Sequence, residues 1–152
     1  MPKASVKRLI ECKKKDLIDL VLDIEKYPEF VPFCFDAKIY ENRNEGDLKK
    51  IIADLTIGKG PFKDTYKSDV VFNRKEDTIF VKNIEGPLNH LSNNWIFVDK
   101  DNGITEVTFD IDFEIKNKFL NSLMVVSFQF GLEKIADAFQ KRAEQLFSLS
   151  LI

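Results

Sequence analysis

The chain has 152 residues, of which 44% are hydrophobic and 32% charged, and its formal net charge is -2. This length fits one domain with a core of its own, so we expect a single domain over residues 1–152. The small negative charge gives no general attraction to nucleic acid, and we expect no DNA binding.

The first two expected elements are a strand and a helix. Residues 3–11 alternate between polar and apolar side chains, which is typical of a strand with one buried face, occupied by Ala4, Val6 and Ile10. Between Leu17 and Ile24, apolar residues recur at helical spacing, so we predict an amphipathic helix over residues 13–25.

The segment that follows, residues 23–34, has an unusual composition for a connection, and we call it the lid segment. Prolines break the helix here and leave room for one short helical turn between Glu25 and Phe30. Connections normally favour small polar residues, whereas this one is rich in apolar side chains. We therefore expect it to cover a cavity, with lid residues Tyr27, Phe30, Val31, Pro32 and Phe33.

A long β region and a final helix complete the chain. After residue 34, apolar side chains recur at every second position, which is typical of strands. Short turn sequences separate these strands, and such short connections favour antiparallel pairing. A long helix is expected over residues 118–149. The order predicts an α+β helix-grip fold, in which a curved antiparallel sheet of six to seven strands wraps the C-terminal helix. The six candidate strands after the lid segment are 35–42, 48–57, 62–72, 78–84, 91–98 and 104–115.

Large apolar side chains converge from several of these elements. The chain has 14 phenylalanines, more than a domain of this size needs, and pockets for apolar ligands are lined in this way. The composition alone is compatible with both interpretations, a solid core and a ligand cavity. The expected wall residues are Trp95, Phe97, Phe109, Ile111, Phe113, Phe128, Ile135 and Phe139.

Signals for catalysis are few. The single histidine, His90, has no nucleophile motif beside it, and the two cysteines, Cys12 and Cys34, are too few for a metal cluster. The carboxylates from Asp110 to Glu114 alternate with apolar residues, which places them on the solvent face of a strand. We expect a non-enzymatic protein with no metal and no cofactor.

Two further features concern location and partners. We see no secretory signal and no run of about 18 apolar residues, so we expect a cytoplasmic protein. Residues 123–132 are apolar nearly all round a helix, which fits burial under the lid, a dimer contact or a transient bilayer contact. The Lys13–Lys15 run fits an anionic lipid, ribosomal RNA or simply a lysine-rich composition.

Three ordered motifs resemble one known family. The lid segment resembles the D-V-E-x-Y-P-E-F-L-P-W-C signature of the coenzyme Q-binding START-domain proteins, within the polyketide cyclase/START superfamily. Residues 85–88 followed by 95–97 are similar to its D-G-P-F and W-x-F motifs. Residues 107–114 and 138–143 are similar to its F-x-F-E-F strand and A-F-x-x-R-A helix end. The resemblance covers roughly the whole chain, with Phe, Glu and Leu at positions 33, 85 and 88 in place of Trp, Asp and Phe.

The resemblance implies binding of ubiquinone or a similar isoprenoid lipid in an internal cavity. A protein of this kind supports respiratory electron transport as a quinone chaperone or carrier. For its location, a peripheral position at the inner membrane is an alternative to a purely cytoplasmic one. The family also includes bacterial ribosome-association toxins that bind the large subunit, so the ribosome remains an alternative partner. A polyketide aromatase/cyclase is a third reading, but it requires polar groups inside the cavity, and the inward-facing sets above are almost wholly apolar.

Overall fold

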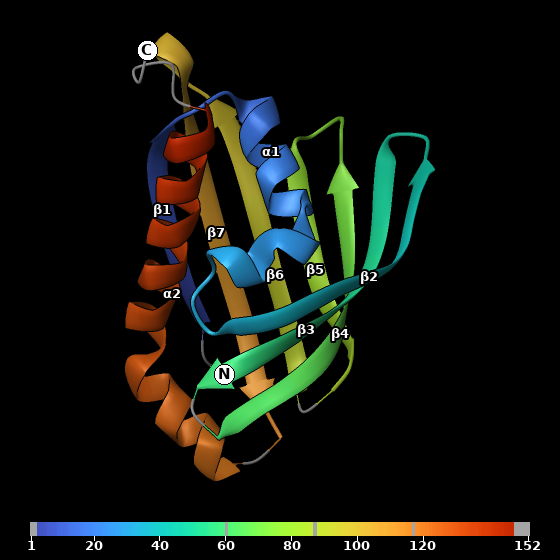
Figure 1. The fold of residues 1–152 in the computed structure, drawn as a ribbon, viewed down its shortest axis with the longest axis vertical. Coiled ribbons are helices and arrows are strands. Elements are labelled where there is room, and N and C mark those ends of the chain that lie inside the picture. Colours follow the sequence, from blue (N-terminus) through green and yellow to red (C-terminus); the bar gives the residue numbers. More distant parts are fainter. Residues whose placement is uncertain (1–2, 60, 87, 117, 148–152) are drawn as a thin grey trace.

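The computed structural model describes residues 3–59, 61–86, 88–116 and 118–147, with the side chains of 59, 62, 88, 89, 115, 119–128 and 130 excepted. In this part of the chain, seven strands form one curved antiparallel sheet with a long C-terminal helix along it (Figure 1). The predicted helix-grip fold is confirmed. In chain order the elements are β1 (Lys3–Glu11), α1 (Lys14–Leu22), the 3₁₀ helix η1 (Ile24–Glu29), β2 (Cys34–Glu45), β3 (Leu48–Lys59), β4 (Phe62–Asn73), β5 (Thr78–Glu85), β6 (Leu88–Asp99), the 3₁₀ helix η2 (Asp101–Gly103), β7 (Ile104–Ile115) and α2 (Lys118–Phe147).

The strand order is β1-β7-β6-β5-β4-β3-β2, so the first and second strands form the two edges. Val6 pairs with Phe109, and Phe109 pairs with Trp95 on the next strand, so all three lie on one face of the sheet. All three are buried in the main core, and we call this the inner face. The predicted alternation of β1 is confirmed, with Val6 and Ile10 buried.

The first helix is shorter than predicted. It ends at Leu22 rather than near residue 25, and a six-residue 3₁₀ helix, η1, follows it and contains Pro28. The reason is local: Asp23 has φ −83° and ψ 65°, which lies outside the helical region and ends the hydrogen-bond pattern. The two short helices predicted after the first strand are therefore present as α1 and η1.

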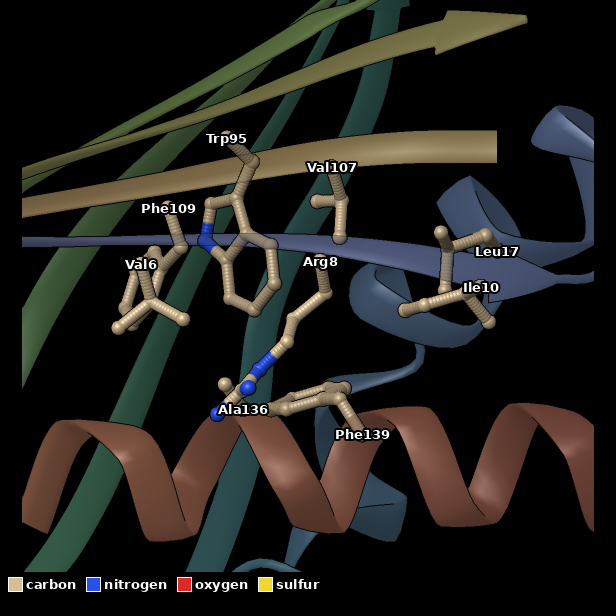
Figure 2. Close-up of a pocket in the computed structure, with 9 residues that line it drawn as sticks. All are labelled: Val6, Arg8, Ile10, Leu17, Trp95, Val107, Phe109, Ala136 and Phe139. Atoms are coloured by element: carbon tan, nitrogen blue, oxygen red, sulfur yellow. The ribbon is translucent and has the colours of Figure 1, made fainter. Parts of the chain in front are cut away.

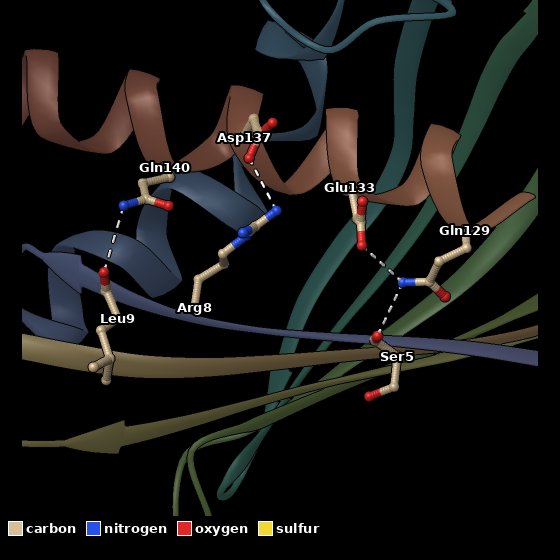
Figure 3. A network of polar contacts seen from close by, with 7 residues as sticks. All are labelled: Ser5, Arg8, Leu9, Gln129, Glu133, Asp137 and Gln140. Atoms are coloured by element: carbon tan, nitrogen blue, oxygen red, sulfur yellow. Dashed lines mark hydrogen bonds and ion pairs between the residues drawn. The ribbon is translucent and has the colours of Figure 1, made fainter.

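The long helix α2 runs beside edge strand β1 (Figure 1). Two glutamine side chains on α2 donate hydrogen bonds to carbonyls of β1, Gln140 to Leu9 and Gln129 to Ser5, each at 3.4 Å (Figure 3). An ion pair of 2.9 Å between Arg8 and an aspartate of α2 lies between them. The helix therefore covers a sheet edge that would otherwise leave backbone groups unpaired.

The sheet is less regular between β5 and β6. The regular pairing of these strands ends at Lys82 and Ser92. Beyond it, the Asn83 side chain accepts a hydrogen bond of 2.8 Å from the Leu91 backbone N–H. A side chain thus replaces a backbone partner at this point of the ladder. Among the helices that the structure describes, none has the length and apolar character needed to cross a bilayer.

Candidate ligand-binding site

The lid segment packs onto α2. The rings of Tyr27 and Phe30 meet the Phe139 ring edge to face, with centroids 5.3 and 5.1 Å away. Arg142 of the same helix makes a 2.8 Å ion pair with Glu29 and lies 5.2 Å from the centre of the Phe30 ring. The apolar composition of this segment is therefore explained by burial against the helix and the core.

Beneath the lid, aromatic rings fill the space between the sheet and the second half of α2. Trp95 stacks on Phe109 with ring centroids 4.2 Å apart and meets the Phe139 ring at 5.1 Å. The remaining cavity is about 10 Å³, lined mainly by apolar side chains and the stem of Arg8 (Figure 2). This volume accommodates about one water molecule. In this half of the interior, the large apolar side chains form a solid core.

A second group of buried side chains lies further along the inner face. Tyr66, Leu91 and Phe113 form this group, with Leu55 and Ile111 packed against it, and we call it the second cluster. It is separate from the main core, although Ile111 and Leu55 touch both. The buried apolar part of the inner face therefore extends beyond the rings around Trp95.

The predicted site residues divide between these regions. Trp95, Phe97, Phe109 and Phe139 are buried in the main core, and Tyr27, Phe30, Val31, Ile111 and Ile135 are partly buried against it. Phe113 belongs to the second cluster, Pro32 is half-buried, and the Phe128 side chain lies outside the described residues.

Phe33 differs from the other lid residues. Its side chain is 36% exposed, and its φ of 70° lies in the left-handed region, which few non-glycine residues adopt. Its carbonyl accepts a 3.0 Å hydrogen bond from the Gly58 N–H, which joins the lid to the end of β3. The exposed side chains of Phe35 and Ile57 belong to the same junction, because residues 34 and 57 are paired.

Polar side chains on the inner face were missed from the sequence. Ser68 and Asn83 are paired opposite each other, and Asn93 is paired with Ile111, so all three lie on this face. These three side chains are exceptions in an interior that is otherwise almost wholly apolar, as expected. Stepping by two from Trp95 reaches Asn93, so strict alternation along β6 would have found it.

Of these three side chains, Asn93 is the one that has a buried atom without a partner among the described residues. Ser68 donates to the Ala53 carbonyl at 3.3 Å, and Asn83 accepts from Leu91. The Oδ1 atom of Asn93 is buried and has no hydrogen-bond partner among the described residues. Leaving such an acceptor unpaired costs about 1–3 kcal/mol, so Asn93 is unfavourable for stability alone.

Burial also affects the titratable groups that face the interior. It raises the pKa of the Tyr66 phenol, so that its hydroxyl stays protonated and remains a hydrogen-bond donor. Burial raises the pKa of the Cys12 and Cys34 thiols to about 11. Both cysteines are free, and the high pKa keeps them in the unreactive thiol form.

The outer face of the sheet carries the carboxylates, as predicted. Asp110 pairs with Ser5 and Asn94, on the side opposite Phe109. His90 also lies on this face, with Nε2 3.7 Å from the nearer Asp112 carboxylate oxygen. Within the described part of the chain, no group of side chains is arranged to hold a metal ion.

The chain matches a known family over most of its length. Residues 11–140 match the family described as polyketide cyclase/dehydrase and lipid transport. The chain belongs to this family. A structure titled as a START superfamily protein from Mycobacterium smegmatis shares the fold, with a TM-score of 0.81 and 21% identity over 95% of this chain and 98% of that one.

Two relatives in this family have different named roles. The ribosome association toxin RatA of Rickettsia prowazekii is 32% identical over 91% of this chain and 94% of its own length. The mitochondrial coenzyme Q-binding protein COQ10 of Dictyostelium discoideum is 29% identical over 86% of this chain and 63% of its own length. The chain is therefore similar both to a named quinone-binding protein and to a named ribosome-association toxin.

Proposed function

We propose that this protein binds an isoprenoid quinone, such as ubiquinone, between the inner face of the sheet and α2, and carries it in support of respiratory electron transport. The observation behind this proposal is the second cluster, an apolar part of the inner face separate from the filled core. The relative named as a coenzyme Q-binding protein supports the choice of ligand. Binding requires no catalytic residue.

An isoprenoid tail suits this surface because it offers almost no hydrogen-bonding groups. Its affinity comes from apolar burial, about 25 cal/mol per Å² removed from water. The solid core under the lid provides a rigid end wall, and Leu91 and Phe113 provide the floor. The proposed ligand therefore lies against the second cluster and the first half of α2, rather than among the rings around Trp95.

The proposed carrier works in the cytoplasm and touches the inner membrane when the ligand enters or leaves. Phe33, Phe35 and Ile57 are 36%, 48% and 38% exposed at the junction between the lid and β3. The Lys63 ammonium lies 3.9 Å from the centre of the Phe35 ring, so this surface combines apolar side chains with positive charge. Such a combination favours the headgroup region of an anionic bilayer.

The direct test is extraction of the purified protein with organic solvent, followed by mass spectrometry. Protein from a quinone-making host should yield quinone at a substantial fraction of one molecule per chain. The variant Ile111→Phe adds bulk beside the second cluster and should lower this yield. The matched control Ile96→Phe makes the same change at a position 39% exposed on the outer face and should not. If the wild type yields no quinone and binds none that is added, the proposal is wrong.

Ribosome binding is a second candidate, favoured by the relative named as a ribosome association toxin. One structural feature weakens it: Lys14, in the middle of the lysine run, is already paired with Asp77 and Asp99 at 2.7 and 3.1 Å. Co-sedimentation with purified large subunits at increasing salt separates the two functions, because an RNA contact weakens steeply with salt. Salt-sensitive binding by protein that carries no quinone would favour the ribosome.

A further inference from the structure

The position of Asn93 places a polar group in an apolar part of the interior. It lies on the inner face of β6, two residues from Trp95 on one side and from Leu91 on the other. Its register partners are Val81 on β5 and Ile111 on β7. All four neighbours are apolar, and the amide is close to the second cluster, where the proposed ligand lies.

Of the three polar side chains near the second cluster, two are satisfied and this one is not. The Ser68 hydroxyl and the Asn83 side-chain oxygen both have partners, whereas Oδ1 of Asn93 is buried with none among the described residues. A carbonyl oxygen can only accept a hydrogen bond, so the missing partner must be a donor. A buried acceptor without a partner, close to the proposed ligand, is therefore suited to a ligand that carries an N–H or O–H group.

We propose that Asn93 binds the head of the ligand through a hydroxyl group, so that the protein binds a quinol more tightly than the corresponding quinone. This inference rests on the proposed quinone-binding function. The two ring oxygens of a quinone are carbonyls and only accept, whereas those of a quinol are hydroxyls and donate. The isoprenoid tail is the same in both forms, so the difference in affinity arises at the head.

The test compares the affinities of ubiquinone-3 and ubiquinol-3 under anaerobic conditions, measured by equilibrium dialysis. A tail of similar length without the ring, farnesene, serves as the third probe. Wild-type protein should bind the quinol about tenfold more tightly than the quinone, since one satisfied hydrogen bond has roughly this value. Asn93→Leu should remove the preference and leave the farnesene affinity within about twofold.

The matched control is Asn94→Leu, which makes the same change on the opposite face of the same strand and should keep the preference. Thermal unfolding of both variants checks the fold. A purely structural role for Asn93 would change the melting temperature but not the ratio of the two affinities. Equal affinity of the wild type for both forms, or an unchanged preference in Asn93→Leu, overturns the inference and leaves quinone binding intact. Failure of all three probes to bind refutes quinone binding, and the inference with it.

Discussion

Gly86 illustrates how one backbone position depends on its neighbour. Its φ is +140°, and a Cβ atom built there would lie 2.7 Å from Cβ and 2.9 Å from Cα of Tyr66. Gly86→Ala should therefore lower the free energy of unfolding by about 2 kcal/mol or more, measured by urea denaturation. Gly46→Ala is the control, because φ there is +61° but no atom lies within 4 Å, so only about 1 kcal/mol of backbone strain is expected. Equal losses in the two variants would show that the contact with Tyr66 has no effect.

The two buried thiols make stability depend on alkaline pH. In the unfolded chain a thiol ionises near its ordinary pKa of 9.0, whereas in the folded protein Cys12 and Cys34 keep their protons up to a pKa of about 11. The folded state therefore binds more protons in this range, and stability should fall as pH rises from 9 to 11. Urea midpoints measured across this range check the prediction. The double variant Cys12→Ala, Cys34→Ala should show a smaller fall, and an identical fall would contradict it.

Within α2, Gly131 is a weak point of the helix. Glycine costs about 1 kcal/mol against alanine in a helix interior, and a Cβ atom at this position would meet no atom within 4 Å. Gly131→Ala should raise the free energy of unfolding by about 0.5–1 kcal/mol. Denaturation curves give the value directly. A loss of stability would mean that the helix needs a glycine here for a reason other than space.

The junction between the lid and β3 should determine binding to membranes. Phe35→Ser removes an exposed ring, and we expect at least a threefold loss of binding to vesicles that contain phosphatidylglycerol, measured by sedimentation. Phe80→Ser is the matched control, because Phe80 is 40% exposed on the outer face, away from the lid. Equal losses in both variants would indicate nonspecific adsorption rather than a defined surface.

In the whole molecule, Phe139 connects three layers. Its ring contacts Tyr27 and Phe30 of the lid segment and Trp95 of the sheet, and it is 3% exposed. Phe139→Ala should cost about 3–5 kcal/mol, because the small cavity beside it would grow and its neighbours cannot all move inward. Thermal or urea unfolding provides the measurement. Phe80→Ala, on the outer face, should cost less than about 1 kcal/mol, and a similar cost for both would contradict this role.

The sequence predicts the fold well because alternation and helical spacing are local properties. Strand β7 is the clearest example of such alternation, since its carboxylates and its aromatic residues occupy opposite faces as expected. The end of α1 was wrong by three residues, because the backbone angle of Asp23 leaves no clear sign in the sequence. The aromatic residues of the interior could be named, but composition cannot distinguish rings that fill a core from rings that line a space. Asn93 was missed because it stands in the polar run Ser92-Asn93-Asn94, which looks like surface unless the alternation from Trp95 is followed strictly.

The two edges of the sheet are not equivalent. Along β1, two glutamine amides of α2 donate to the carbonyls of Ser5 and Leu9. Along β2, in the part of the chain that the structure describes, η1 covers the start of the strand, where the Ile39 N–H donates to the Glu25 carboxylate at 3.0 Å. Any chain that extends this sheet by β-augmentation must therefore add to β2, in a single orientation relative to the fold. Lys38, Glu41 and Arg43 lie along that strand, and these charges disfavour uncontrolled stacking of identical copies there. The sheet can therefore be extended only at the β2 edge, and the charges on β2 disfavour addition of a second copy of the chain there.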